Sequence, residues 1–219
     1  MFDSLKRLIG VSSSAGDATA VLASWAKAEG HVFKHVTLKS GEGYVVETPH
    51  GWRVEWGPSQ RPYIIGKELR FRCETGVPGD VQMVMLTKVL AQTLESDVFN
   101  RYTDAMQTQI DATMPDEMRW LAMHARVSLN DSAVLSRRFA LLCNAEELAK
   151  DWLDGPTVQA LEHAASHWWT DALVLVVTLN RGILTARMAG QPLEVAQLQM
   201  VGDLFARLAD RWRAVAVKL

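Results

Sequence analysis

The segment Asp171–Met188 reads DALVLVVTLNRGILTARM, and it is the stretch of sequence that decides the fold. Two runs rich in Val, Leu and Ile flank the tripeptide Asn180-Arg181-Gly182. Asn and Gly accept the positive φ angles that a tight turn between antiparallel strands requires. The segment therefore predicts a β-hairpin whose turn lies at these three residues.

Strand patterns recur in other parts of the chain. In YVVETPHGWRVEW (44–56), Trp52 and Trp56 alternate with charged residues, and His50-Gly51 marks the expected turn. Such alternation places one set of side chains on a buried face. Three further segments are predicted to be extended, namely residues 31–38, 68–74 and 137–143. Together these strands indicate antiparallel sheet.

Apolar residues at helical spacing predict the helices 17–29, 81–100, 117–124, 144–153, 155–168 and 193–215. Asp17 and Asn144 are the expected N-caps of two of them, and Gly30 is an expected stop. The first residues of the helix from Val81 could equally form a strand. A short strand is expected at 106–110.

These patterns predict an α+β protein in which helices pack on one face of antiparallel sheet. We divide the chain into an N-terminal amphipathic helix (1–9) with a polar linker to residue 16, a first α+β half (17–125) and a second half (126–219). The halves either form two similar lobes or pack closely as one domain. No internal repeat at the level of residues decides between these alternatives.

The composition excludes several classes of protein. The 219 residues include 23 basic and 25 acidic ones, a formal net charge of -2, and 48% are apolar. Because nucleic-acid-binding domains carry a basic excess, no nucleic-acid partner is expected. Cys73 and Cys143 indicate buried thiols in a reducing compartment, and with no secretory signal the expected location is cytoplasmic. The longest uncharged apolar run, 172–179, is shorter than the ~20 residues that span a bilayer.

The stretch EHAASHWW (162–169) raises the question of a metal site. His163 and His167 lie one helical turn apart, a spacing that two ligands of one ion can have. A helical wheel places both opposite the apolar arc, so we expect them to face solvent. No third ligand and no HExxH motif accompany them. Metal binding is therefore the weaker interpretation, and we expect no cofactor.

Tryptophan is unusually frequent, with eight residues. Trp168 falls on the apolar arc of its helix and is expected in the core, as are Trp25, Trp52, Trp56, Trp120, Trp152 and Trp212. Trp169 lies where the helix must end before the next strand, and the wheel does not assign it to the core. We therefore single out Trp169 as a candidate contact for a partner.

The string YTDAMQTQIDATMPDEMRWL (102–121), with ELRFRCETGVPGD before it, resembles a group of uncharacterised bacterial proteins. These share Tyr-Thr-Asp, Gln-Thr, Ile-Asp and Pro-(Asp/Glu)-Glu-Met-Arg-Trp-Leu. The resemblance implies a bacterial source, and it brings no activity, cofactor or catalytic residue. Arg119 and Trp120 at its centre are candidate binding residues; the alternative is a guanidinium laid over a packed indole.

The sequence contains no GxSxG elbow, dinucleotide fingerprint or P-loop. We therefore expect a non-catalytic interaction or assembly module that binds a protein partner or itself through sheet edges and exposed aromatic residues. Two alternatives stay open. One is a metal-assisted hydrolase that uses His163 and His167, and the other is a peripheral membrane protein attached by residues 1–9.

Overall fold

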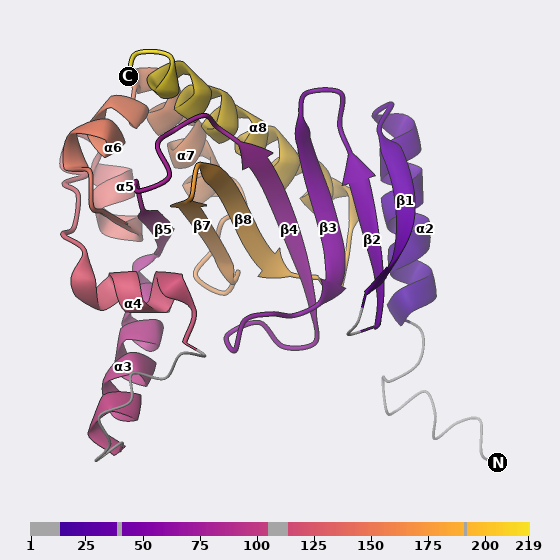
Figure 1. The fold of residues 1–219 in the computed structure, drawn as a ribbon, viewed down its shortest axis with the longest axis horizontal. Helices are drawn as coiled ribbons and strands as arrows, with labels where there is room; N and C mark the ends of the chain where they lie inside the picture. Colours follow the sequence, from indigo (N-terminus) through magenta and orange to yellow (C-terminus); the bar gives the residue numbers. More distant parts are fainter. Residues whose placement is uncertain (1–13, 39–40, 105–113, 191) are drawn as a thin grey trace.

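The computed structural model describes residues 14–38, 41–104, 114–190 and 192–219. In this part of the chain, eight strands form one antiparallel sheet in the order β1-β2-β3-β4-β8-β7-β5-β6 (Figure 1). The strands are β1 (Val32–Leu38), β2 (Gly41–Glu47), β3 (Trp52–Pro58), β4 (Lys67–Glu74), β5 (Met83–Thr87), β6 (Phe139–Cys143), β7 (Leu175–Asn180) and β8 (Ile183–Ala189). The predicted α+β class with antiparallel sheet is confirmed.

The predicted hairpin is formed by β7 and β8. Asn180 pairs with Ile183, and Arg181 and Gly182 between them have positive φ angles of 52° and 73°. A two-residue turn with these angles matches the twist of antiparallel strands. Because β8 pairs with β4 while β7 pairs with β5, the hairpin joins the first four strands to the rest of the sheet.

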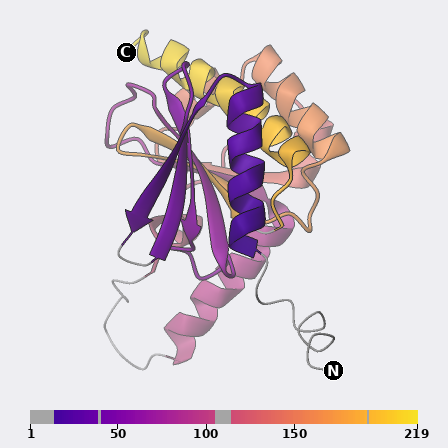
Figure 2. The same ribbon diagram turned by 90° about the vertical axis from the view of Figure 1, so that its right-hand side faces the viewer.

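Helices cover the two faces of the sheet unequally (Figures 1 and 2). One face carries α2 (Ser14–Ala28), α5 (Ala133–Arg138), α6 (Glu146–Trp152), α7 (Gly155–His167) and α8 (Val195–Ala216). The other face carries α3 (Lys88–Asp104) and α4 (Asp116–Met123), which pack against β5, β6 and β7. The expectation that helices lie on one face is corrected by these last two.

Strand β5 accounts for the second helical layer. Its Met83 and Met85 belong to the main core beneath α8, whereas Val84 and Leu86 belong to a second core beneath α3 and α4. With both faces covered, the whole strand is buried and reads as one apolar run. The helix predicted from Val81 is therefore wrong over β5, and the alternative of an initial strand is confirmed.

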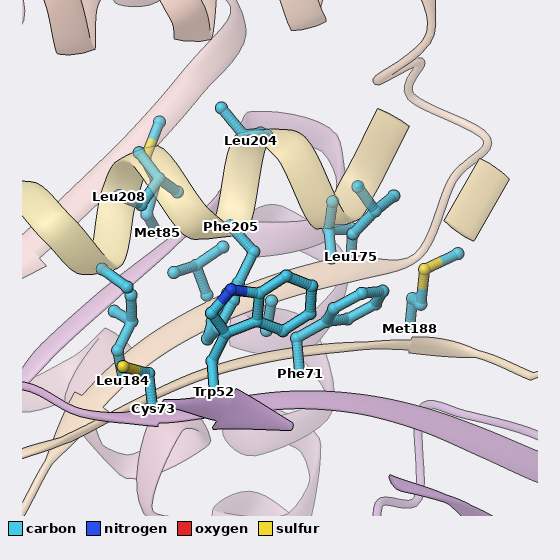
Figure 3. Close-up of a cluster of buried hydrophobic side chains, with 14 of the residues drawn as sticks. Trp52, Phe71, Cys73, Met85, Leu175, Leu184, Met188, Leu204, Phe205 and Leu208 are labelled. Atoms are coloured by element: carbon cyan, nitrogen blue, oxygen red, sulfur yellow. The ribbon is translucent and has the colours of Figure 1, made fainter. Parts of the chain in front are cut away.

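The main core lies between α8 and the sheet. Trp52 and Phe71 each approach Phe205 of α8, with ring centroids 5.8 Å apart in both pairs (Figure 3). Gly202 of α8 faces the same aromatic cluster: a Cβ there would be in ordinary van der Waals contact with Trp52 at 3.4 Å and with Trp25 at 3.7 Å. The predicted burial of Trp25, Trp52, Trp56, Trp120, Trp152 and Trp212 is confirmed.

Neither predicted N-cap occupies a cap position. Helix α2 already begins at Ser14, which places Asp17 in its first turn. Asn144 instead bridges two parts of the chain: its amide nitrogen donates to the carbonyl of Asp80 at 2.7 Å, and its oxygen accepts from the backbone of Gln82 at 2.8 Å. These tertiary bonds tie the end of β6 to the start of β5.

Both predicted halves contribute to one sheet, since β5 of residues 17–125 pairs with β6 and β7 of residues 126–219. The helix predicted at 1–9 and the strand predicted at 106–110 fall outside the described residues. Among the described helices, none has the length and the apolar character needed to cross a bilayer.

Candidate functional site

The stretch EHAASHWW forms the end of α7 and the turn after it. Both Trp168 and Trp169 donate their backbone N–H to the carbonyl of Ala164, so the helix ends at His167. Trp169 is 0% exposed and its ring packs edge-on against Phe139, 4.7 Å between centroids. Trp168 is only half-buried.

The expectation for Trp169 is therefore wrong, whereas Trp168 packs against the main core, as expected, but is only partly buried. Trp169 is not an exposed contact residue, and Trp168 is the one that reaches the surface. The wheel overstates the burial of Trp168 because it extends helical geometry beyond His167, whereas Trp168 has φ -143° and ψ -27°. A helical wheel holds only where the backbone is helical.

The two histidines face solvent, as predicted. Their rings stack with centroids 4.1 Å apart and planes inclined by 26°, and Nδ1 of His167 bonds the carbonyl of His163 at 2.8 Å. Ring lone pairs lie in these planes, which at so small an angle do not meet within a Zn–N bond of about 2.1 Å. Among the described residues no group of three His, Cys, Asp or Glu could hold a metal ion.

What the structure adds is a groove between α7 and α8 that contains His163 and Trp168. Its volume is about 470 Å³. Three small or apolar side chains, Ala160, Ala164 and Leu204, contribute to its lining. The remaining lining residues are Pro156, Gln159, His163, Trp168, Met200, Asp203 and Arg207. We call this set the α7–α8 groove.

A second hollow continues the α7–α8 groove. It has a volume of about 450 Å³ and shares Trp168 and Met200 with the first. Met200 is 39% exposed and Val195, one and a half turns earlier on α8, is 43% exposed. Trp168 and Met200 thus stand at the middle of an apolar surface that two hollows flank. Contiguous apolar surface of this kind is typical of interaction sites.

Two opposite charges accompany the groove. Asp203 and Arg207 are four residues apart on α8, a spacing at which acid and base often pair. They do not pair here: Asp203 accepts a hydrogen bond from Gln199 Nε2 at 3.1 Å, and Arg207 has no ion pair with any described residue. Both side chains are exposed, and neither forms an ion pair with a described residue.

The other candidate pair, Arg119 and Trp120, lies on α4, away from the groove. Trp120 is buried in the second core and stacks on His124 at 5.8 Å. Arg119 forms an ion pair with Asp116 in the preceding turn. No cation–π contact joins Arg119 to Trp120 in the described part of the chain. Both side chains therefore make contacts within the protein itself.

Sequence reasoning missed the α8 side of the groove. Met200 and Leu204 lie off the arc of α8 that faces the sheet. Apolar residues at such positions could have indicated a second contact surface on this helix. The charges of Asp203 and Arg207 carried none, because a charged residue on a helix surface is ordinary.

The fold and the groove define a class: an antiparallel α+β protein with a solvent-open, largely apolar groove between two surface helices. No family model matches the chain, and no curated protein sequence is significantly similar to it. The resemblance of residues 102–121 to uncharacterised bacterial proteins thus stays a prediction.

Among solved structures, the chain is similar to the mycobacterial trehalose monomycolate transport factor A, TtfA. The identity is 11% and the TM-score 0.49, with 90% of this chain and 94% of that chain covered. A likeness of this size carries no information about what the present chain binds.

Proposed function

We propose that this protein is an interaction module that binds a protein chain through the α7–α8 groove. The observation that carries the proposal is the apolar surface around Trp168 and Met200, which two hollows flank. Aromatic and Met side chains are enriched where interfaces are buried. A hollow of about 470 Å³ accommodates one or two large apolar side chains of a partner.

The occupant that the charges favour is a second copy of this chain. In a two-fold symmetric interface, both copies use the same surface, so each contact between two residues occurs twice with the copies exchanged. Two α8 helices packed antiparallel about an axis between Asp203 and Arg207 would place each acid opposite the base of the other copy. The same surface thus supplies both the acid and the base of each ion pair between the copies. The apolar surface of each copy is covered by that of the other.

The test is the oligomeric state of a Met200→Glu variant, measured by sedimentation velocity and native mass spectrometry at about 1 to 100 µM. Burying a Met side chain contributes about 1.5–3 kcal/mol. A buried Glu loses that contribution, so the dissociation constant of the dimer should rise about tenfold to hundredfold.

The matched control is Met123→Glu. Met123 is a more exposed methionine, 73% accessible, on α4 at the other face of the sheet. This variant should dimerise like the wild-type protein. A wild-type protein that is monomeric over the whole range, or equal weakening by both variants, contradicts the proposal of a second copy in the groove.

The alternative functions have less support. For the metal-assisted hydrolase, His163 and His167 stack rather than converge. For attachment to a membrane surface, the segment concerned lies outside the described residues. Both stay predictions from the sequence.

A further inference from the structure

The face of the sheet opposite α8 presents charged side chains over its first half. Figure 1 shows β2, β3 and β4 with no helix in front of them. Four arginines extend from this face: Arg53 of β3, Arg70 and Arg72 of β4, and Arg187 of β8. We call them the arginine cluster.

The cross-strand register brings like charges together. Arg70 lies directly opposite Arg187, and Arg72 lies directly opposite Arg53. Like charges at directly opposed positions destabilise a sheet unless something compensates them. Glu47 of β2 lies directly opposite Arg53 but pairs with Lys34. The two carboxylates that form ion pairs with the four guanidinium groups are Glu55 and Glu68.

Those two carboxylates are already shared. Glu55 Oε1 accepts from Arg53 Nε at 2.7 Å and from Arg72 Nη1 at 3.3 Å. Glu68 is fully buried; one of its oxygens pairs with Arg187, and the other accepts from the backbone N–H of Gln60 at 2.8 Å. Neither carboxylate accepts a hydrogen bond from Arg70.

Arg70 is the residue left least satisfied. It is 7% exposed, and its buried Nε forms ion pairs with Glu55 at 3.3 Å and with Glu68 at 4.0 Å. Neither ion pair is a hydrogen bond, and Arg70 donates no hydrogen bond to any described residue. A buried guanidinium group whose ion pairs lack hydrogen bonds is only partly compensated for the loss of water. Burial accordingly lowers the pKa of Arg70.

We propose that Arg70, with Arg72 and Arg187 beside it, binds an oxyanion group of a ligand on this face of the sheet, either a phosphate or a carboxylate. Guanidinium groups present planar pairs of donors that match both groups. The ligand supplies the acceptors that Arg70 lacks and offsets the repulsion between opposed arginines. This site is separate from the α7–α8 groove, which lies on the other side of the sheet.

The experiment measures thermal unfolding of the full chain with inorganic phosphate or acetate, at constant ionic strength maintained with chloride. Phosphate should raise the melting temperature saturably, by about 3 °C or more at tenfold above half-saturation. Stabilisation by both anions means that the site accepts carboxylates as well as phosphates. Stabilisation by phosphate alone means that the site is selective for phosphoryl groups. A chain that neither anion stabilises beyond chloride overturns the proposal.

Three variants make the test specific. Arg72→Gln should weaken phosphate binding at least about fivefold, since it removes a partly exposed donor group. Glu55→Gln should strengthen binding, because it removes the acid that competes for Arg53, Arg70 and Arg72. Arg126→Gln is the control, an exposed arginine paired with Glu95 elsewhere on the surface; it should leave binding unchanged.

Weaker binding in Glu55→Gln, or an equal loss in Arg126→Gln, would overturn the oxyanion site. The response should persist in Met200→Glu. Failure of the groove proposal and failure of this one can therefore be told apart.

Discussion

At the scale of single residues, His31 shows how tertiary packing sets a side chain's chemistry. Its ring sits edge-on to Trp25 at 5.1 Å and to Trp52 at 6.0 Å, and its Nδ1 is buried with no hydrogen-bond partner among the described residues. Burial lowers the pKa of His31, although nearby Glu29 acts in the opposite direction. The neutral ring is therefore the form that the folded protein favours.

This predicts a pH dependence of stability with a definite sign. A histidine whose pKa is lowered on folding binds fewer protons in the native state, so stability falls as pH drops through the unfolded pKa of about 6.5 towards the folded value. His124, whose pKa is also lowered by burial, adds to the effect.

Denaturant unfolding of wild type and His31→Phe checks this prediction between about pH 8 and about pH 5, a range that brackets the ordinary histidine pKa. The variant keeps an aromatic ring and cannot titrate, so its stability should depend less on pH than that of wild type. Identical slopes for the two proteins would show that His31 has no part in the dependence.

At the scale of elements, the groove arises from how α7 and α8 pack. Ala160 and Ala164 are one turn apart on α7 and leave space that larger side chains would fill. Leu204 is 6% exposed, although it lines the groove, whereas Met200 one turn earlier stays exposed. The pairing of small residues on one helix with an exposed methionine on the other forms the hollow that we propose as a binding surface.

The proposed antiparallel arrangement of two α8 helices predicts that reversing both charges restores association. Arg207→Asp places two acids opposite each other twice in the dimer, and should weaken association about tenfold, since exposed pairs contribute up to about 1 kcal/mol each. Adding Asp203→Arg restores both pairs in the reverse sense and should recover most of the affinity.

Sedimentation velocity of the single and double variants measures this directly. If the double variant is weaker than Arg207→Asp alone, the two residues do not face each other across a two-fold axis, and a different geometry of self-association would be required.

At the scale of the whole molecule, the β7–β8 hairpin connects the two parts of the sheet. β7 and β8 stand between β4 and β5, so the strands before and after them form a continuous ladder. The turn also packs closely on another loop: a Cβ at Gly182 would lie 2.9 Å from the carbonyl oxygen of Val77. The backbone N–H of Thr75 donates to the carbonyl of Gly182 at 2.9 Å.

Gly182→Ala should therefore destabilise the whole chain, not the C-terminal part alone. Gly182 and Gly30 both have left-handed φ angles, 73° and 68°, but nothing lies within 4 Å of a Cβ at Gly30. Gly30→Ala should cost about 1 kcal/mol from backbone strain, and Gly182→Ala more than about 2 kcal/mol because the clash adds to it.

Urea unfolding followed by circular dichroism and by tryptophan fluorescence tests both parts of this prediction. The two signals should give one coincident transition, shifted as a unit by Gly182→Ala. Separate transitions would mean that the halves unfold independently in spite of the shared sheet.

Local patterns in the sequence determined much of this molecule. The alternation in residues 44–56 and the hairpin at Asp171–Met188 predicted strands that the structure contains, and the wheel of α7 placed His163 and His167 in solvent. Such predictions succeed because the period of a strand or helix fixes which side chains share a face.

The tertiary structure alone decided the rest. The α7–α8 groove needs residues about 40 positions apart, and the arginine cluster joins Arg70 to Arg187 by a register that no local pattern carries. Trp169 is fully buried and Trp168 only partly buried, because the helix ends at His167. Periodicity assigns faces within an element, but the order of strands and the packing of helices decide which faces meet.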